Sequence, residues 1–159
     1  MAVKTEAPGD TVSTDRIEKR VVLRAPRTRV WRALTNAEEF GTWFRVKIEG
    51  AFTEGKSVRG KLSIPGYEHV TLEMLVERID PEQYFSYRWH PYAVDPAVDY
   101  SAEPTTLVEF KLEETDGGTA LTIVESGFDR TPPARRAEAF RMNDNGWTGE
   151  IKQLAKYVE

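Results

Sequence analysis

The sequence predicts an α+β fold in which one curved antiparallel sheet of seven strands wraps around a long C-terminal helix. Apolar residues recur at helical spacing from Ala134 to Val158. Short strand-like stretches between Val46 and Ser126 are separated by turn residues, and their short links favour an antiparallel meander over parallel strands, which need long crossovers. Since such a sheet buries only one face, the helix stripe and the concave face should cover each other.

The length and composition are those of one domain. The chain has 159 residues, of which 40% are hydrophobic, which suits a single core. The net charge of −4 and the pI near 5.4 argue against nucleic-acid binding, which needs a basic stripe to neutralise phosphates. The absence of cysteine from the sequence excludes disulfides, a thiolate nucleophile and zinc sites built from cysteine.

The first residues, Met1–Asp15, differ in composition from the rest of the chain. They are polar, contain Pro8 and Gly9, and show no apolar stretch typical of a signal peptide. We therefore expect residues 1–15 to form a disordered arm and residues 16–159 to form the domain. No apolar run approaches the roughly twenty residues that span a bilayer, so we expect a soluble, cytoplasmic protein.

The first predicted strand, Ile17–Arg24, alternates apolar with charged residues. Ile17, Val21 and Leu23 fall on one side, which is the pattern of a half-buried strand. A short helix is expected next, because Pro26 suits the first helical turn, where its missing N–H would have no partner. Apolar residues then follow at helical spacing at Val30, Ala33 and Leu34.

A second short helix is predicted to begin after Asn36. Asn36 and Glu39 stand three residues apart, as in a capping box. Phe40, Trp43 and Phe44 follow within this helix. Core packing is the simpler interpretation of Trp43 and Phe44, and contact with a ligand is the alternative.

The remaining strands are predicted at Val46–Gly50, Ser57–Ser63, Glu68–Ile79, Tyr84–His90, Thr105–Glu113 and Gly118–Ser126. Phe85, Tyr87 and Trp89 alternate along one of these strands, so its aromatic face belongs against the core or a cavity. The long irregular segment Pro91–Pro104 is either a lid over a binding site or a solvated excursion.

The apolar stripe of the final helix has a gap. The stripe consists of Ala137, Phe140, Trp147, Ile151, Leu154 and Val158. In its middle the inward position falls on Asn143 or Asp144, which either places a polar group in a cavity or marks the edge of the helix at solvent. Gly146 and Gly149 each cost about 1 kcal/mol relative to alanine. Close approach of helix to sheet is the simpler explanation of the glycines, and room for a ligand is the alternative.

Few residues suggest catalysis. The two histidines, His69 and His90, lie on different predicted strands, without the spacing of a catalytic triad or metal site. A structural role is the simpler interpretation, and a general base beside a carboxylate is the alternative. Glu125 continues the apolar alternation of the last strand, so it either points inward, with Arg88 or His90 as a partner, or ends the strand in solvent. No cofactor or metal is expected.

The order of motifs resembles the START-like (SRPBCC) superfamily. Within it, the chain looks like the branch named for the activator of heat shock protein 90 ATPase. The resemblance covers roughly Arg16 to Val158 and is carried by Val22-Leu23-Arg24-Ala25-Pro26, Val30-Trp31-Arg32-Ala33-Leu34-Thr35, Glu39-Phe40, Trp43-Phe44, Ile79-Asp80-Pro81, Tyr87-Arg88-Trp89, Thr106-Leu107-Val108-Glu109-Phe110, Gly118-Thr119, Glu125-Ser126-Gly127-Phe128 and Gly146-Trp147. It implies a helix-grip (START/Bet v-like) fold with a cavity between sheet and helix.

The resemblance implies three candidate functions. The first is non-catalytic binding of a small hydrophobic molecule in a cavity of roughly 300–1,000 Å³, lined by Trp43, Phe44, Met74, Tyr87, Trp89, Phe110 and Trp147, with Glu125 and Asn143 as orienting groups. The second is a co-chaperone-like interaction with a heat-shock ATPase. The third is a polyketide cyclase or dehydratase activity that uses His69, His90 or Glu125. Pairing of exposed sheet edges would also permit a homodimer.

Overall fold

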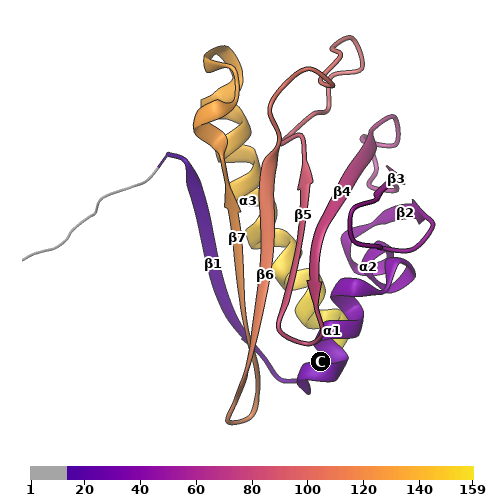
Figure 1. Ribbon diagram of the computed structural model, residues 1–159, viewed down its shortest axis with the longest axis vertical. Coiled ribbons are helices and arrows are strands. Elements are labelled where there is room, and N and C mark those ends of the chain that lie inside the picture. Colours follow the sequence, from indigo (N-terminus) through magenta and orange to yellow (C-terminus); the bar gives the residue numbers. More distant parts are fainter. Residues whose placement is uncertain (1–13) are drawn as a thin grey trace, which may run out of the picture.

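The computed structural model describes residues 14–159, which form a curved seven-stranded antiparallel sheet around one long helix (Figure 1). In chain order the elements are β1 (Arg16–Leu23), α1 (Arg27–Thr35), α2 (Ala37–Phe44), β2 (Val46–Glu49), β3 (Ser57–Leu62), β4 (Thr71–Asp80), β5 (Tyr84–Trp89), β6 (Thr106–Thr115), β7 (Gly118–Ser126), the 3₁₀ turn η1 (Phe128–Arg130) and α3 (Pro133–Val158). This arrangement confirms the predicted fold class and the order of all the predicted strands and helices.

The sheet has the strand order β1-β7-β6-β5-β4-β3-β2, so the chain folds back to place its first strand beside its last. Every pair is antiparallel, and β1 and β2 form the two edges. The pairing of β4 with β5 shifts register between Val76 and Arg78. Such a bulge increases local twist and therefore contributes to the curvature that lets one face of the sheet enclose α3.

The two short helices begin where local chemistry predicts. Asn36 caps α2, since its side-chain oxygen accepts a hydrogen bond from the Glu39 backbone N–H at 3.0 Å. The Glu39 carboxylate does not form the second hydrogen bond of a capping box, to the backbone N–H of Asn36. It accepts hydrogen bonds from Arg29 Nη1 at 2.7 Å, Arg32 Nε at 2.8 Å and the Tyr157 hydroxyl at 3.1 Å. Glu39 thereby fastens α1 and α2 to the C-terminal end of α3.

The buried stripe of α3 differs from the predicted one at its N-terminal end. Trp147, Leu154 and Val158 are buried as predicted, and Phe140 and Ile151 are partly buried. Ala137 is exposed and Ala139 is fully buried instead. The prediction for Ala137 was wrong because the stripe runs back from Trp147 in steps of four residues, which leads through position 143 to Ala139.

The predicted N-terminal arm lies outside the described residues except at its last two positions. Thr14 donates a hydrogen bond from Oγ1 to Asp129 Oδ1 at 3.0 Å. The backbone oxygen of Asp15 accepts from the N–H groups of Gly127 and Phe128. In the part of the chain that the structure describes, no helix has both the length and the apolar character needed to cross a membrane.

Candidate functional site

The space between the sheet and α3 is filled largely by aromatic rings. Neighbouring rings have centroid separations between 4.9 and 6.4 Å, mostly in edge-to-face or tilted geometry, the arrangement that aromatic quadrupoles favour. The cluster comprises Phe40, Trp43, Phe44, Phe52, Phe85, Tyr87, Trp89, Phe110 and Trp147. Most of the predicted cavity is therefore packed core.

Glu125 is a fully buried carboxyl at the edge of this aromatic cluster. It accepts hydrogen bonds from the indole N–H groups of Trp89 and Trp147, each at 2.8 Å, from Thr106 Oγ1 at 2.6 Å and from Asn143 Nδ2 at 3.0 Å. Burial raises the pKa of Glu125, while these four hydrogen bonds lower it. Because Glu125 lies on β7 and its donors come from β5, β6 and α3, Glu125 ties the helix to the sheet.

Glu125 points inward as predicted, but both partners proposed from the sequence are wrong. Arg88 lies on the opposite side of its strand from Trp89 and donates from Nε to Glu77 at 2.6 Å. His90 Nε2 lies 2.9 Å from the backbone oxygen of Glu103. Neutral donors therefore take the place of the expected cation. The sequence held an indication of this, because each of the two tryptophans carries an indole N–H group that can donate to a buried carboxylate.

An apolar pocket of about 240 Å³ lies beside the aromatic cluster, between α3, the adjacent ends of β3, β4 and β5, and the β3–β4 and β5–β6 connections. It is smaller than the roughly 300–1,000 Å³ typical of ligand sites. A recess of about 90 Å³ adjoins it and is lined by Phe44, Trp89, Asn143, Gly146, Trp147 and Glu150. The pocket shares five of these residues and is further lined by Leu62, Ile64, Tyr67, Val70, Leu72, His90, Tyr92, Ala93, Val94 and Met142.

The structure separates the nine predicted ligand-binding residues into two groups. Phe44, Trp89, Asn143 and Trp147 line the pocket or its recess. The other five are buried in the packed layer of the interior: Trp43, Met74, Tyr87, Phe110 and Glu125. The sequence placed all nine in the interior, and only the packing distinguishes a residue of the pocket wall from one behind it.

The polar gap in α3 is occupied by one inward and one outward residue. Asn143 faces Glu125 and the pocket. Asp144 faces β1, where its Oδ1 lies 2.8 Å from Lys19 Nζ. The interpretation that a polar group enters the interior therefore holds for Asn143 alone.

The glycines of α3 do not mark a close approach to the sheet. A Cβ atom added at Gly146 or Gly149 would meet no other group within 4 Å, and both residues are exposed. Close approach of the helix to the sheet, the simpler explanation of these two glycines, was therefore wrong. Gly146 lines the pocket and its recess, so the missing side chain at this position leaves open space there.

Glu150 is the site residue that sequence reasoning missed. It lies one turn after Trp147 and lines both the pocket and the recess. Its Oε1 atom is buried and has no hydrogen-bond partner. Burial raises the pKa of Glu150 to about 7, with the charge of Arg45 acting in the opposite direction. The signal was available, because the spacing from Trp147 to Leu154 passes through position 150 on the same face.

The connection between β5 and β6 is held over the pocket by side chains from outside it. Arg135 donates from Nη1 to the backbone oxygens of Pro91 and Tyr92, at 3.0 and 3.2 Å, and from Nη2 to Glu103 Oε1 at 2.8 Å. Tyr92, a pocket residue, has a positive φ of 47°, a conformation that costs energy in a residue with a side chain. The connection therefore forms a wall of the pocket and does not extend freely into solvent.

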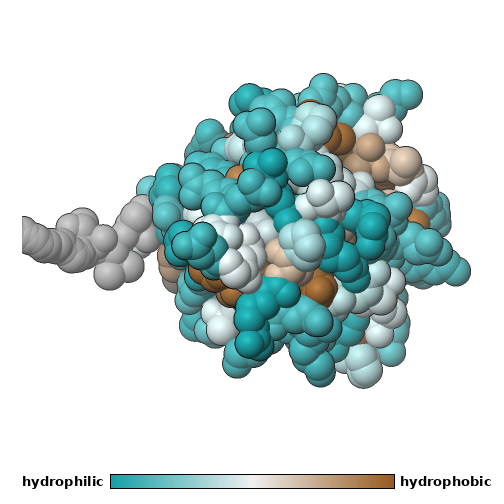
Figure 2. Space-filling view, turned by 90° about the horizontal axis from the view of Figure 1, so that it is seen from below, coloured by the Kyte–Doolittle hydropathy of each residue, from teal (hydrophilic) through white to brown (hydrophobic). Residues whose placement is uncertain are grey.

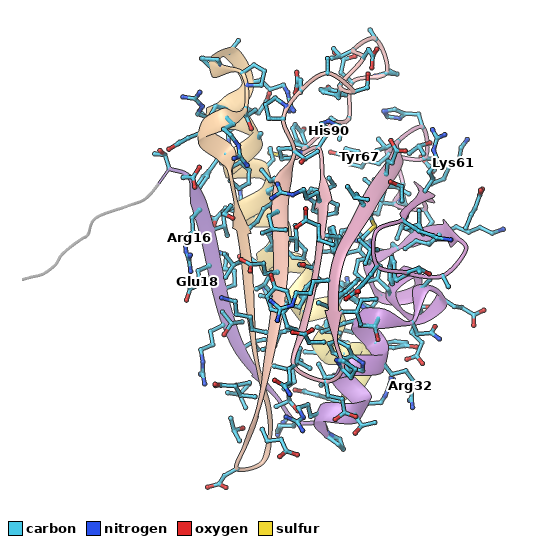
Figure 3. All side chains as sticks on the ribbon, in the orientation of Figure 1. Arg16, Glu18, Arg32, Lys61, Tyr67 and His90 are labelled. Atoms are coloured by element: carbon cyan, nitrogen blue, oxygen red, sulfur yellow. The ribbon has the colours of Figure 1, made fainter. Side chains whose placement is uncertain are left out.

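Both histidines contact backbone oxygens of the β5–β6 connection. His69 Nε2 lies 3.0 Å from the backbone oxygen of Val94, and His90 Nε2 contacts Glu103 in the same way. Figure 3 shows His90 and Tyr67, both pocket residues, at the upper end of the sheet. These contacts agree with the structural interpretation of both histidines. Within residues 14–159, no group of three or more His, Asp or Glu side chains is placed to hold a metal ion.

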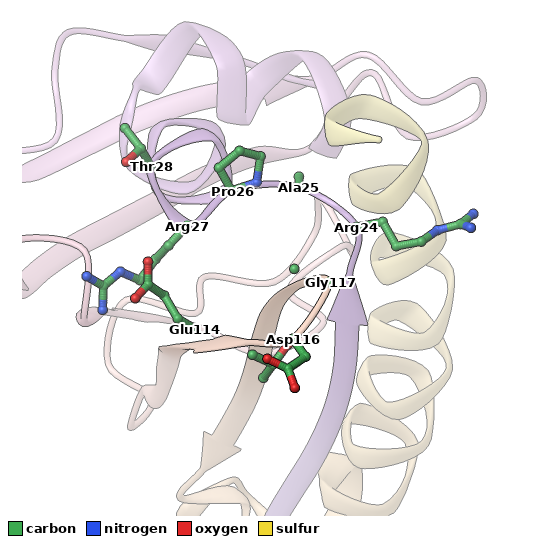
Figure 4. Close-up of a pocket in the computed structure, with 10 residues that line it drawn as sticks. Arg24, Ala25, Pro26, Arg27, Thr28, Glu114, Asp116 and Gly117 are labelled. Carbon is green, nitrogen blue, oxygen red and sulfur yellow. The ribbon is translucent and has the colours of Figure 1, made fainter.

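A larger but more polar depression lies at the opposite end of the sheet, beside the β6–β7 turn (Figure 4). It has a volume of about 890 Å³ and is lined by residues 24–28 and 114–118. Its wall consists largely of turn backbone and charged side chains such as Arg24, Glu114 and Asp116. The surface seen from this end is mostly hydrophilic (Figure 2). An open polar groove does not bury a hydrophobic ligand, so the apolar pocket is the better candidate site.

A curved antiparallel sheet that encloses a C-terminal helix, with an apolar pocket between them, defines the helix-grip class of proteins. The profile of the family described as "Activator of Hsp90 ATPase homolog 1-like protein" matches residues 24–159. The chain belongs to this family, which confirms the resemblance noted in its sequence. No curated protein matches the chain.

Several solved structures share the fold. Protein MLL2253 from Mesorhizobium loti is 24% identical, with a TM-score of 0.71 over 90% of this chain and 96% of that chain. The solution structure of the Aha1 dimer from Colwellia psychrerythraea is 18% identical, with a TM-score of 0.67 over 91% and 96% of the two chains. DynU16, a putative protein in the dynemicin biosynthetic locus, is 23% identical, with a TM-score of 0.70 over 91% of this chain but only 47% of its own. At these identities the likeness concerns the fold.

Proposed function

We propose that this protein binds a small hydrophobic molecule in the pocket between α3 and the sheet, without catalysing a reaction on it. The observation that carries this proposal is the apolar pocket itself, which lies beside a fully packed core. Phe44, Trp89, Asn143 and Trp147 are the predicted residues proposed to contact the ligand, and Gly146 and Glu150 join them. A hydrophobic body with one polar group suits this lining.

Three further features support binding at this place. The open space beside Gly146 is kept at a cost to helix stability of about 1 kcal/mol. The strained backbone at Tyr92 forms part of the wall, and such strain is concentrated at functional sites. The β5–β6 connection is held by hydrogen bonds of Arg135, His69 and His90, so the wall of the pocket is built before a ligand arrives.

A matched pair of glycine substitutions tests the proposal. Gly146→Leu fills the pocket, whereas Gly149→Leu places the same side chain at an exposed helical position outside it. Both changes should stabilise α3 by about 0.5–1 kcal/mol, because glycine is a poor helix former. Thermal shift and native mass spectrometry against a panel of small lipophilic molecules should show ligands for the wild type and Gly149→Leu, and none for Gly146→Leu. A panel that binds neither the wild type nor either variant would contradict the proposal.

Family membership supports a second candidate, a co-chaperone-like interaction with a heat-shock ATPase. Purified chain should then stimulate the ATPase of a cognate chaperone, and Gly146→Leu should leave this stimulation intact, because an interaction surface does not require the pocket. Failure of the two purified proteins to associate at high micromolar concentration would contradict this candidate.

Catalysis of the cyclase or dehydratase kind has less support. The two histidines contact backbone oxygens, and Glu125 already accepts four hydrogen bonds. A catalytic acid or base needs a free position toward its substrate, so these three residues are better explained as structural groups.

A further inference from the structure

Glu150 places one carboxyl group in the wall of an otherwise apolar pocket. Of the residues that line the pocket and its recess, Glu150 is the one acid, and neither lysine nor arginine is among them. Its Oε1 atom is buried without a hydrogen-bond donor. Within residues 14–159, no basic nitrogen lies within ion-pair distance of Glu150. The nearby Arg45 is exposed and acts on it only through longer-range charge.

Glu125, the fully buried glutamate of the interior, has the hydrogen-bond partners that Glu150 lacks. Glu125 is held by four protein donors, whereas Glu150 is held by none at Oε1. Tyr87 lies within electrostatic reach of both carboxyls, yet its buried hydroxyl makes no hydrogen bond to either. Buried polar atoms are paired in nearly all native structures, and an orphaned one calls for a specific explanation. A donor supplied by a ligand is such an explanation.

The surroundings of Glu150 favour one class of donor. A carboxylate or phosphate ligand would bring a second negative charge beside Glu150, with no lysine or arginine in the wall to offset it. His90, the one imidazole of the wall, has its Nε2 atom against the backbone oxygen of Glu103. A purely apolar ligand would leave Oε1 unpaired. A protonated amine would form a charge-assisted hydrogen bond with the carboxylate, and the rings of Phe44, Trp89 and Tyr92 in the same wall would attract it through cation–π interactions.

We propose that the ligand is a small amine, with its ammonium group on the Glu150 carboxylate and its apolar body against Val70, Leu72 and Tyr92. This inference rests on the proposed function and assigns the chemical class of the ligand. A pocket of about 240 Å³ corresponds to the volume of roughly eight water molecules, so the amine is small, with about ten non-hydrogen atoms. The uncharged wall opposite Glu150 accepts an aryl or short alkyl group.

Three molecules with one skeleton and different charge test the inference. 2-Phenylethylamine, 2-phenylethanol and phenylacetate are titrated into the protein at about pH 8, where the amine is protonated and Glu150 is ionised. Isothermal titration calorimetry should show the amine binding about tenfold or more tighter than the alcohol, and no binding of phenylacetate. Equal affinity for amine and alcohol would overturn the amine inference while leaving the binding function intact. Failure of the amine, the alcohol and every other member of the lipophilic panel to bind would overturn both.

Two charge variants of α3 complete the test. Glu150→Gln should reduce amine affinity to that of the alcohol, and alcohol affinity should change less than about threefold. Asp144→Asn removes the same charge from the same helix, but on the face toward Lys19, and should keep the tenfold preference. Loss of the preference in Asp144→Asn, or its retention in Glu150→Gln, would show that general charge rather than Glu150 selects the amine.

Discussion

Glu125 and Glu150 are two glutamates in the same interior, and the difference between their surroundings separates structure from function in this fold. Glu125 is fully buried, and its carboxylate accepts hydrogen bonds from four donors on the strands and the helix. Glu150 lies two turns further along α3 than Asn143, one of those donors, and its buried oxygen has no partner. The first carboxyl belongs to the core and holds the helix on the sheet. The second faces a pocket and remains available for a ligand.

The largest expected effect follows from loss of the Glu125 carboxylate. Glu125→Gln keeps the shape of the side chain but places an NH₂ group among four donors, so at least one buried donor loses its acceptor. We expect a loss of about 3–5 kcal/mol in the free energy of unfolding, as for other broken buried networks, measured by urea denaturation. Glu150→Gln, the same change at the pocket, should not destabilise the protein near neutral pH, because ionisation of the buried Glu150 costs the wild type stability there. A cost below about 1 kcal/mol for Glu125→Gln would remove the distinction between the two sites.

A smaller effect is expected at the clamp over the pocket. Arg135→Lys keeps the positive charge but loses the fork that contacts Pro91, Tyr92 and Glu103 together. We expect a stability loss of about 1–2 kcal/mol and faster amide hydrogen exchange in residues 91–104, with unchanged exchange in β7. Arg136→Lys is the matched control, since within residues 14–159 the one side-chain hydrogen bond of Arg136 goes to the backbone oxygen of Thr131 at 3.1 Å. Faster exchange throughout the sheet would mean that pocket and core unfold as one unit.

A further difference between the two glutamates is a pH dependence of stability that belongs to Glu150. Because burial raises the pKa of folded Glu150 to about 7 from an unfolded value of 4.5, the folded state binds more protons between these values. Stability therefore falls as pH rises through this window. Glu150→Gln lacks the titration and should match the wild type near pH 4.5 but exceed its stability by about 3 kcal/mol near pH 8. Glu138→Gln, on the exposed side of α3, should follow the wild-type curve. A constant difference between Glu150→Gln and the wild type at all pH values would contradict the assigned pKa.

The fold could be predicted from the sequence, because the spacing of apolar residues indicates which side chains are buried. Alternation along the last strand placed Glu125 in the interior, and the helical stripe placed Trp147 beside it. The same reasoning did not identify the pocket residues Tyr67 and Tyr92, because both lie on connections whose path depends on tertiary contacts such as those of Arg135 and His69. Glu150 was on the stripe and was missed, because a charged residue at an inward position breaks an apolar pattern.

The sequence also could not show which aromatic residues line the pocket and which lie in the packed core. Trp43 and Phe44 are neighbours on α2, yet Trp43 donates its indole N–H to the backbone oxygen of Ala33 at 2.8 Å, whereas Phe44 lines the pocket. Pattern alone gives both residues the same inward face. The crossing of α2 over the end of the sheet decides which of them meets open space.

A crystal structure of the protein with 2-phenylethylamine would show most directly whether Glu150 binds the amine while Glu125 remains part of the core. We expect ligand density between α3 and the β5–β6 connection, with the amine nitrogen within roughly 2.7–3.0 Å of a Glu150 carboxylate oxygen and Glu125 still bound to its four donors. A saturated crystal with an empty pocket, or with the amine on another surface and Glu150 Oε1 unpaired, would contradict this expectation.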